Sequence, residues 1–216
     1  MQKAGALLLM LLLCLPVMLF AQEDNDPSID DWENYTSELY SRGDQTFVIS
    51  LGVGFPVAFI STQDGKIGNT TYKAFDRRPN NIDPPVGGAG TLSYHYYFGS
   101  FFFVGGDLGL LFFPTVSKST IYITSLGAKA GTQLIFGRFE FPIFVTVGMT
   151  LQTYLNDQYY YGMYMKGGIS AYFRATHEWS FGVTSNYCWY PQWTDVPSQN
   201  VDGHFIDLIL SARYHF

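Results

Sequence analysis

From residue 45 onward the chain alternates apolar and small polar residues with a period of two. Successive side chains of a β-strand point to opposite faces, so this period predicts strands that carry one apolar row and one polar row. The alternating segments are separated by Gly, Pro, Asn and Asp, which are turn formers. No run of about 20 apolar residues follows residue 44, so this part of the sequence offers no candidate for a membrane-spanning helix.

Eight segments follow the pattern, at residues 45–55, 86–98, 101–112, 121–136, 139–152, 159–173, 179–190 and 204–216. The connections between them alternate in length, from about thirty residues after the first segment to two residues after the second. This alternation is typical of an up-and-down transmembrane β-barrel, with long outer loops and short periplasmic turns. The sequence therefore predicts an all-β, eight-stranded antiparallel barrel over residues 45–216.

The residue types of the two rows indicate which row faces outward. The interior of an eight-stranded barrel is only wide enough for side chains to fill it. A row of Gly, Ser, Thr and a few charges fits that space, whereas the row of Phe, Tyr, Trp, Leu and Met would overfill it. A soluble barrel would place the apolar row inside and would need charged side chains outside. Charged residues make up only 14% of the chain, which favours the membrane barrel.

Aromatic residues gather at the two ends of the predicted strands, with an aliphatic band between them. Two aromatic girdles at this spacing match the two interfaces of a membrane. The members at one end are Phe47, Phe98, Phe101, Phe136, Phe139, Phe141, Phe173, Trp179, Tyr214 and Phe216, and those at the other are Phe55, Phe112, Phe113, Tyr122, Tyr154, Tyr159, Tyr160 and Trp189.

Residues 1–21 have the features of a secretory signal peptide. Lys3 precedes an apolar stretch at residues 4–20, and polarity returns directly after Ala21. A single transmembrane anchor is the alternative, although the stretch is short for one. Lipid attachment at Cys14 is disfavoured because the apolar run continues beyond it. Removal of the signal peptide leaves Cys188 as the sole cysteine, so no internal disulfide is expected.

Residues 22–44 are predicted to form an acidic, solvated tail. They hold eight of the 18 acidic residues, whereas acids and bases balance from residue 45 onward. The segment is poor in apolar residues and rich in charge, as solvated tails are. The chain has no basic patch of the kind that nucleic-acid binding requires, so nucleic acid is excluded as a partner.

Five charged residues fall in the polar row and are candidates for a charge network in the lumen, namely Asp107, Lys129, Lys166, Asp207 and Arg213. Ionisable groups inside a barrel must be paired to be tolerated. We expect a hydrogen-bonded, salt-bridged network that fills the lumen and fixes the strand register. The alternative is that the same side chains line a narrow polar path.

The sequence does not support catalysis or metal binding. Its four histidines are His95, His177, His204 and His215, and none stands in a recognisable Ser-His-acid arrangement. No group of ligands has the spacing of a metal site. We therefore expect a non-enzymatic protein without a cofactor or a metal.

The C-terminal residues 208–216 alternate apolar residues and close on Phe216. This ending is similar to the terminal strand of small outer-membrane barrels, and the chain resembles the OmpA/OmpX/OmpW type over residues 45–216. The resemblance implies a bacterial outer-membrane location in a Gram-negative-type envelope, contact with outer-membrane lipid, and a monomer. It also implies that Tyr214 and Phe216 form the signal read by the barrel-assembly machinery.

The expected function is a structural or surface role with the lumen mostly filled by side chains. The alternative is an OmpW-like, porin-like channel for small hydrophobic or polar solutes. Four prolines near strand ends, Pro56, Pro114, Pro142 and Pro191, could interrupt hydrogen bonding in the wall for that purpose. Loops at residues 56–85 and 190–203 could instead bind a surface ligand or a host component.

Overall fold

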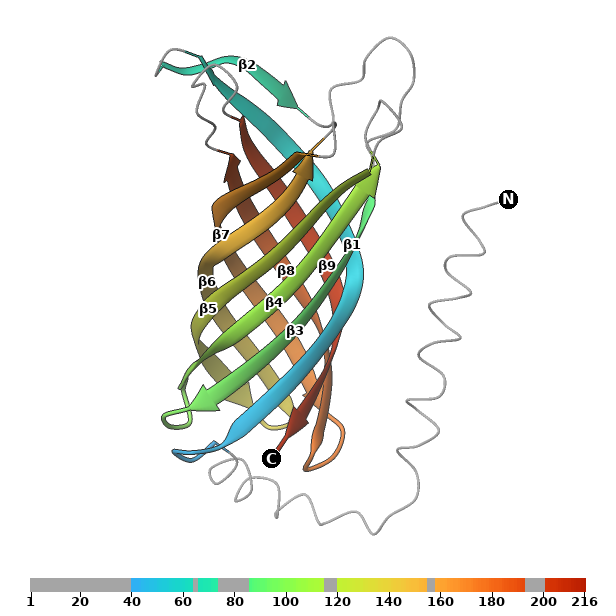
Figure 1. Cartoon of the computed structure of the whole chain (residues 1–216). Coiled ribbons are helices and arrows are strands. Elements are labelled where there is room, and N and C mark those ends of the chain that lie inside the picture. Colours follow the sequence, from blue (N-terminus) through green and yellow to red (C-terminus); the bar gives the residue numbers. More distant parts are fainter. Residues whose placement is uncertain (1–39, 64–65, 74–85, 115–119, 155–157, 193–200) are drawn as a thin grey trace, which may run out of the picture. The chain divides into compact units, whose positions relative to one another are not determined.

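The computed structural model describes residues 40–63, 66–73, 86–114, 120–154, 158–192 and 201–216. These residues form nine strands (Figure 1): β1 (Gln45–Gln63), β2 (Lys66–Lys73), β3 (Gly87–Tyr97), β4 (Phe102–Pro114), β5 (Thr120–Phe136), β6 (Phe139–Tyr154), β7 (Gln158–Arg174), β8 (Trp179–Gln192) and β9 (Val201–His215).

Eight of these strands close into a barrel. Each strand from β3 to β8 pairs antiparallel with the next, and β1 pairs with both β3 and β9. The β1–β9 pairing runs from Thr46↔His215 to Ser61↔Val201. A closed barrel leaves no free sheet edge in its wall, which satisfies the backbone groups as a membrane requires. The predicted eight-stranded antiparallel fold is confirmed.

The barrel has two distinct ends. The turn end holds the connections at residues 98–101, 137–138 and 175–178, together with the start of β1 and the end of β9. At the opposite end, β1 continues beyond the barrel wall and pairs with β2 (Figure 1). We call this second end the hairpin end.

The two rows of side chains face as the sequence predicts. In the outward row, Leu126 is 65% exposed and Met149 is 75% exposed, whereas the inward Thr146 is 0% exposed. The same alternation continues along the other barrel strands. The apolar row is therefore the outer face of the barrel, and the polar row lines its lumen.

The lumen also holds aromatic and aliphatic side chains in two clusters, which the prediction of a mainly Gly, Ser and Thr interior did not include. One cluster lies toward the hairpin end and includes Tyr164, Tyr190 and Phe205. The other lies toward the turn end and comprises Tyr40, Tyr97, Phe103 and Phe144. The small residues of the inward row leave room for these rings, so the interior is a packed core.

The first strand is longer than predicted, and part of the predicted loop at residues 56–85 is a hairpin. β1 reaches Gln63 instead of Phe55, and its last residues pair with β2 from Ala58↔Lys73 to Gln63↔Lys66. The register of the β1–β9 pairing shifts between Pro56 and Ala58, which marks a β-bulge. Before this bulge the other edge of β1 pairs with β3, and after it with β2. The alternation weakens beyond Phe55, and this is why the sequence pattern ends the strand too early.

The predicted signal peptide, Cys14 and residues 22–39 of the predicted tail lie outside the described residues, as do residues 74–85 and 193–200 of the two predicted binding loops. In the part of the chain that the structure describes, no helix has both the length and the apolarity needed to cross a membrane.

Candidate functional site

The first group of polar side chains surrounds Asp107 near the middle of the lumen. Lys166 Nζ donates a hydrogen bond to Asp107 Oδ2, and Lys129 Nζ lies 3.5 Å from Asp107 Oδ1. Ser93 Oγ donates to the same carboxylate over 2.6 Å. All four residues are buried. We call Ser93, Asp107, Lys129 and Lys166 the central cluster.

Strand register brings the central cluster together. Ser93 on β3 pairs with Asp107 on β4, and Thr146 on β6 lies between Lys129 on β5 and Lys166 on β7. The ring of Phe144 lies 3.9 Å from Lys129 Nζ, a cation–π contact. A Cβ at position 168 would overlap this ring, so Gly168 makes room for the contact.

Asp207 lies apart from these hydrogen bonds. Its Oδ2 accepts a hydrogen bond from the thiol of Cys188 over 3.3 Å, and its Oδ1 has no hydrogen-bond partner. The carboxylate nevertheless interacts electrostatically with Lys166. The central region of the lumen therefore contains two carboxylates and two ammonium groups, with Asp107 in direct contact with both lysines.

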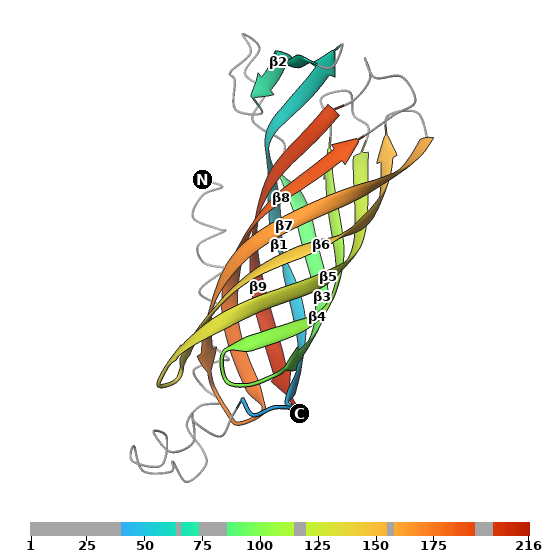
Figure 2. The same cartoon turned by 90° about the vertical axis from the view of Figure 1, so that its left-hand side faces the viewer.

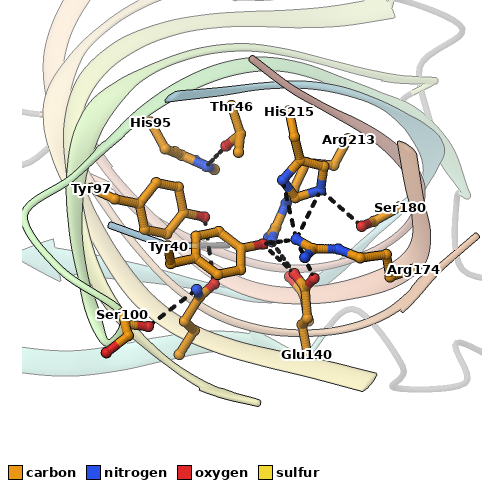
Figure 3. A network of polar contacts seen from close by, with 12 residues as sticks. Tyr40, Thr46, His95, Tyr97, Ser100, Glu140, Arg174, Ser180, Arg213 and His215 are labelled. Atoms are coloured by element: carbon orange, nitrogen blue, oxygen red, sulfur yellow. Dashed lines mark hydrogen bonds and ion pairs between the residues drawn. The ribbon is translucent and has the colours of Figure 1, made fainter. Parts of the chain in front are cut away.

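The second group of charges lies at the turn end and surrounds Glu140 (Figure 3). Arg174 Nη2 lies 2.8 Å from Glu140 Oε1, and Arg213 Nη1 lies 2.7 Å from Glu140 Oε2. His215 accepts a hydrogen bond at Nδ1 from Arg174 over 3.3 Å. Arg213 also stacks over the ring of Tyr172, 3.9 Å from its centre.

Tyr40 completes this second group from outside the barrel strands. Its hydroxyl donates to Glu140 Oε2 over 2.6 Å and accepts from Arg174 over 2.9 Å and from Arg213 over 3.3 Å. Burial raises the pKa of this hydroxyl well above its usual value, with a further contribution from Tyr97. The phenol therefore stays protonated and donates to the carboxylate. We call Tyr40, Glu140, Arg174 and Arg213 the turn-end cluster.

A belt of hydroxyl groups lies between the two clusters. Ser50 Oγ and Ser211 Oγ are 2.8 Å apart, Ser211 Oγ and Thr184 Oγ1 are 3.2 Å apart, and Thr184 Oγ1 and Ser170 Oγ are 2.7 Å apart. All four residues are buried. This belt links β1, β9, β8 and β7 through side chains as well as through backbone pairing.

Little empty space remains beside the central cluster. An internal cavity of about 10 Å³ is lined by residues that include His95, Lys129 and Asn186. This volume is at the lower limit for one water molecule. His95 Nε2 and Asn186 Oδ1 are buried without a protein partner, so they are suitable partners for such a water.

The contact between Ser180 and His215 resembles two members of a catalytic triad, with 2.9 Å between Ser180 Oγ and His215 Nε2. A triad histidine needs an acid at Nδ1 so that Nε2 is free to accept the serine proton. Here the neighbour of His215 is the cation Arg174, whose Nη2 lies 3.3 Å from Nδ1 and 3.5 Å from Nε2. A cation therefore stands where a triad would have its acid.

The structure thus divides the five predicted lumen charges. Asp107, Lys129 and Lys166 are brought together, Asp207 bonds to Cys188, and Arg213 joins a separate cluster at the turn end. The proposed single network is two clusters. The sequence analysis did not identify Tyr40, Glu140 and Arg174 as members of the turn-end region. It also did not predict that His215 contacts Arg174.

A signal for two of the missed residues was present in the sequence. Glu140 continues the inward row of Thr146 and Phe144, and Arg174 continues the inward row of Lys166 and Ser170. Both were overlooked because they border the predicted turns. Tyr40 carries no such signal, since it precedes the first strand and lies in the acidic segment.

The C-terminal aromatics lie on the outer face at the turn end. Tyr214 pairs in register with Phe47 and Trp179, and its ring centre is 5.0 Å from that of Trp179. Phe216 is exposed. Among the described residues no group of three His, Cys, Asp or Glu side chains could hold a metal ion.

Comparison of the sequence with known proteins identifies a family and two relatives. One protein-family model matches residues 22–214. An uncharacterized protein of Treponema pallidum (strain Nichols) is 24% identical over 175 residues, which cover 81% of this chain and 78% of that protein. A second Treponema pallidum protein of the same description is 35% identical over 111 residues, or 47% of this chain and 38% of that protein.

Among solved structures, Neisserial surface protein A has the same fold. The two superpose with a TM-score of 0.54 and 8% sequence identity, over 79% of this chain and 97% of that one. At this identity the similarity establishes the eight-stranded barrel fold and not a shared role.

Proposed function

The chain belongs to the protein family whose model matches residues 22–214, and we propose that it is a monomeric bacterial outer-membrane barrel with a structural or surface role. Its lumen is closed to solutes by the two ion-paired clusters. The observation that carries this proposal is the contrast between an apolar outer face and an interior packed with buried, paired charges.

The outer face supports a membrane location. Exposed residues such as Leu51, Leu126 and Met149 form a band that water would solvate poorly but lipid accommodates. Aromatic residues border this band at the turn end, where Phe136, Phe139 and Trp179 are exposed. By the resemblance to small outer-membrane barrels, the turn end faces the periplasm and the hairpin end faces outward.

Insertion into lipid can be tested with one outward residue. Val145 on β6 lies in the middle of the apolar band and is 51% exposed. We expect Val145→Arg to destabilise the lipid-folded barrel by about 2–4 kcal/mol, with Val145→Leu as the matched control. The measurement is the free energy of unfolding from lipid vesicles, and equal stability of the two variants would contradict a lipid-facing position.

Closure of the lumen can be tested by solute flux. We expect vesicles that contain the refolded protein to release a small polar solute no faster than protein-free vesicles, because ion-paired side chains occupy the lumen and its cavity measures only about 10 Å³. Rapid release of the polar solute would overturn the closed-lumen proposal.

A second candidate function is lateral passage of small hydrophobic molecules, and a gap in the β7–β8 pairing favours it. Among the described residues this pairing begins at Met165↔Trp189, although β7 starts at Gln158 and β8 continues to Gln192. Figure 2 shows the two strands separating toward the hairpin end. An opening there would connect the hairpin end of the lumen with the lipid.

Pro191 explains why the pairing stops. A Cβ at Gly162 on β7 would lie 3.0 Å from the carbonyl oxygen of Pro191, so this carbonyl faces β7. In an antiparallel strand the N–H of a residue points to the same side as its carbonyl group. Proline lacks that N–H, and the ladder loses a donor where it would otherwise continue.

The lateral route predicts that Pro191→Thr lowers the flux of a small hydrophobic solute into vesicles by restoring the missing donor. Pro114→Thr is the matched control, because Pro114 ends β4 and is still part of the β4–β5 pairing, opposite Thr120. Equal hydrophobic flux for both variants and the parent protein would exclude the β7–β8 route.

One partner follows from the same proposal, the barrel-assembly machinery. Phe216 is exposed and Tyr214 is half-buried at the turn end of the terminal strand, where barrel-assembly machinery would read them during insertion. Loss of both aromatics by Tyr214→Ala and Phe216→Ala should lower the amount of protein inserted in cells. Unchanged insertion would remove the assembly role from these residues.

A further inference from the structure

Tyr40 is the one member of the turn-end cluster that no barrel strand carries. Its side chain enters the lumen from the segment before β1 and contacts residues of β6, β7 and β9 (Figure 3). Its ring also packs on Tyr97 of β3, with 4.4 Å between ring centres. Only 2% of Tyr40 is exposed. A residue from outside the wall thus occupies a site built by four strands.

A local turn directs Tyr40 into the barrel. Ser41 donates to the carboxylate of Asp44 from its backbone N–H over 2.7 Å and from its hydroxyl over 3.1 Å. Gly43 has a φ of 113°, which favours glycine, and its N–H donates to Tyr97 O over 3.0 Å. These contacts form a turn before β1 and attach it to the end of β3, so turn residues and one contact with β3 set the position of Tyr40.

The site that Tyr40 occupies carries an excess of positive charge. Arg174 and Arg213 contribute two guanidinium groups, and Glu140 is the one carboxylate that bonds to them among the described side chains. The central cluster differs, because Asp207 also acts on Lys166 there. The neutral Tyr40 hydroxyl accepts hydrogen bonds from both arginines but adds no negative charge.

The arginines also retain unused hydrogen-bonding capacity. Arg174 Nε and Arg213 Nε are buried and have no partner, and both residues are at most 3% exposed. Guanidinium groups bind oxyanions through several donors at once. Two guanidinium groups that face one carboxylate and one phenol can therefore donate hydrogen bonds to a second anionic oxygen in place of the phenol.

We propose that the turn end of the barrel contains a binding site for a small oxyanion, a carboxylate or a phosphate, formed by Arg174 and Arg213 and occupied in this structure by Tyr40 as a tethered plug. Withdrawal of Tyr40 breaks no pairing in the barrel wall and leaves the two arginines with one acceptor fewer. An anion that enters from the turn end takes the place of the Tyr40 hydroxyl.

The test uses inorganic phosphate as the probe and the full-length protein refolded in lipid vesicles. Tyr40→Ala empties the site, and Tyr40→Phe is the matched control because its ring still fills the space. We expect phosphate, compared with chloride at equal ionic strength, to raise the Tm of Tyr40→Ala by roughly 5–10 °C at about 100 times its Kd. The parent protein and Tyr40→Phe should shift by much less.

A double variant identifies the ligands. Adding Arg174→Gln to Tyr40→Ala removes one guanidinium group and should abolish the phosphate shift. A shift of equal size in all variants, or no shift in Tyr40→Ala, would overturn the proposal.

If Tyr40→Ala refolds poorly, its refolding yield becomes the readout. Phosphate should then raise the fraction of folded barrel above that obtained in chloride, because the anion replaces the lost acceptor. An equal yield in both salts would overturn the proposal as well.

Discussion

The central cluster and the turn-end cluster share one arrangement, a buried carboxylate held between two cations. Asp107 lies between Lys129 and Lys166, and Glu140 lies between Arg174 and Arg213. They differ in the fourth partner. Ser93, which donates to Asp107, is carried by the barrel wall, whereas Tyr40, which donates to Glu140, comes from outside it.

This difference separates a structural device from a potential binding site. The central cluster is built wholly by strands, and the carboxyl group of Asp207 also acts on its Lys166. The turn-end cluster has two arginines that can each bind a carboxylate through two donors, lies at the turn end of the barrel, and is completed by a residue from outside the wall. The carboxylate of the central cluster mainly stabilises the strand register. The turn-end cluster, by our proposal, can replace Tyr40 with an anion.

The largest expected effect comes from Glu140→Gln. It leaves two buried guanidinium groups without a counter-charge, and breaking a buried pair in this way costs about 3–5 kcal/mol. The measurement is the free energy of unfolding in lipid. Glu178→Gln is the control because Glu178 is exposed in a turn. A loss no greater than that of the control would show that the turn-end cluster contributes little.

Asp107→Asn should follow, with a loss of about 3 kcal/mol, at the lower end of the same range. The amide still accepts a hydrogen bond from Ser93 or Lys166, and the remaining carboxylate of Asp207 acts on Lys166. Urea unfolding of Asp107→Asn beside Glu140→Gln ranks the two clusters. A larger loss for Asp107→Asn would reverse the comparison between them.

The two lysines of the central cluster should differ. Lys166 bonds closely to Asp107, whereas Lys129 lies 3.5 Å away and stacks on Phe144. We expect Lys166→Met to cost about 1.5–3 kcal/mol, as for a hydrogen bond to a charged group, and Lys129→Met to cost less because methionine keeps the contact with the ring. Equal losses of stability for the two variants, measured by thermal unfolding, would show that both ion pairs contribute equally.

The smallest effect is expected in the hydroxyl belt between the clusters. Ser50→Ala removes one neutral hydrogen bond with Ser211 and should cost about 0.5–1.5 kcal/mol. The double-mutant cycle with Ser211→Ala measures the pair itself. A coupling as large as that of the ion pairs would mean that the belt, and not the charges, holds the strands in register.

Much of the fold followed from the sequence. The two-residue period separated Val145 from Thr146 and placed Leu126 outside and Lys129 inside, because neighbouring side chains of a strand cannot share a face. The same rule placed Asp107, Lys129 and Lys166 in the lumen. The two-residue period did not predict two features at strand ends. It missed the extension of β1 beyond Phe55, and it missed the inward-facing Glu140 beside a turn.

The sequence by itself determined the eight barrel strands and their two faces, since these follow from local alternation and from the volume that such an interior can hold. Only the tertiary structure decided which lumen charges meet. Contact between Arg213 of β9 and Glu140 of β6 depends on strand stagger and on barrel closure, and neither is encoded within a segment. The insertion of Tyr40 is likewise a long-range contact, made by a residue whose local sequence predicts only solvation.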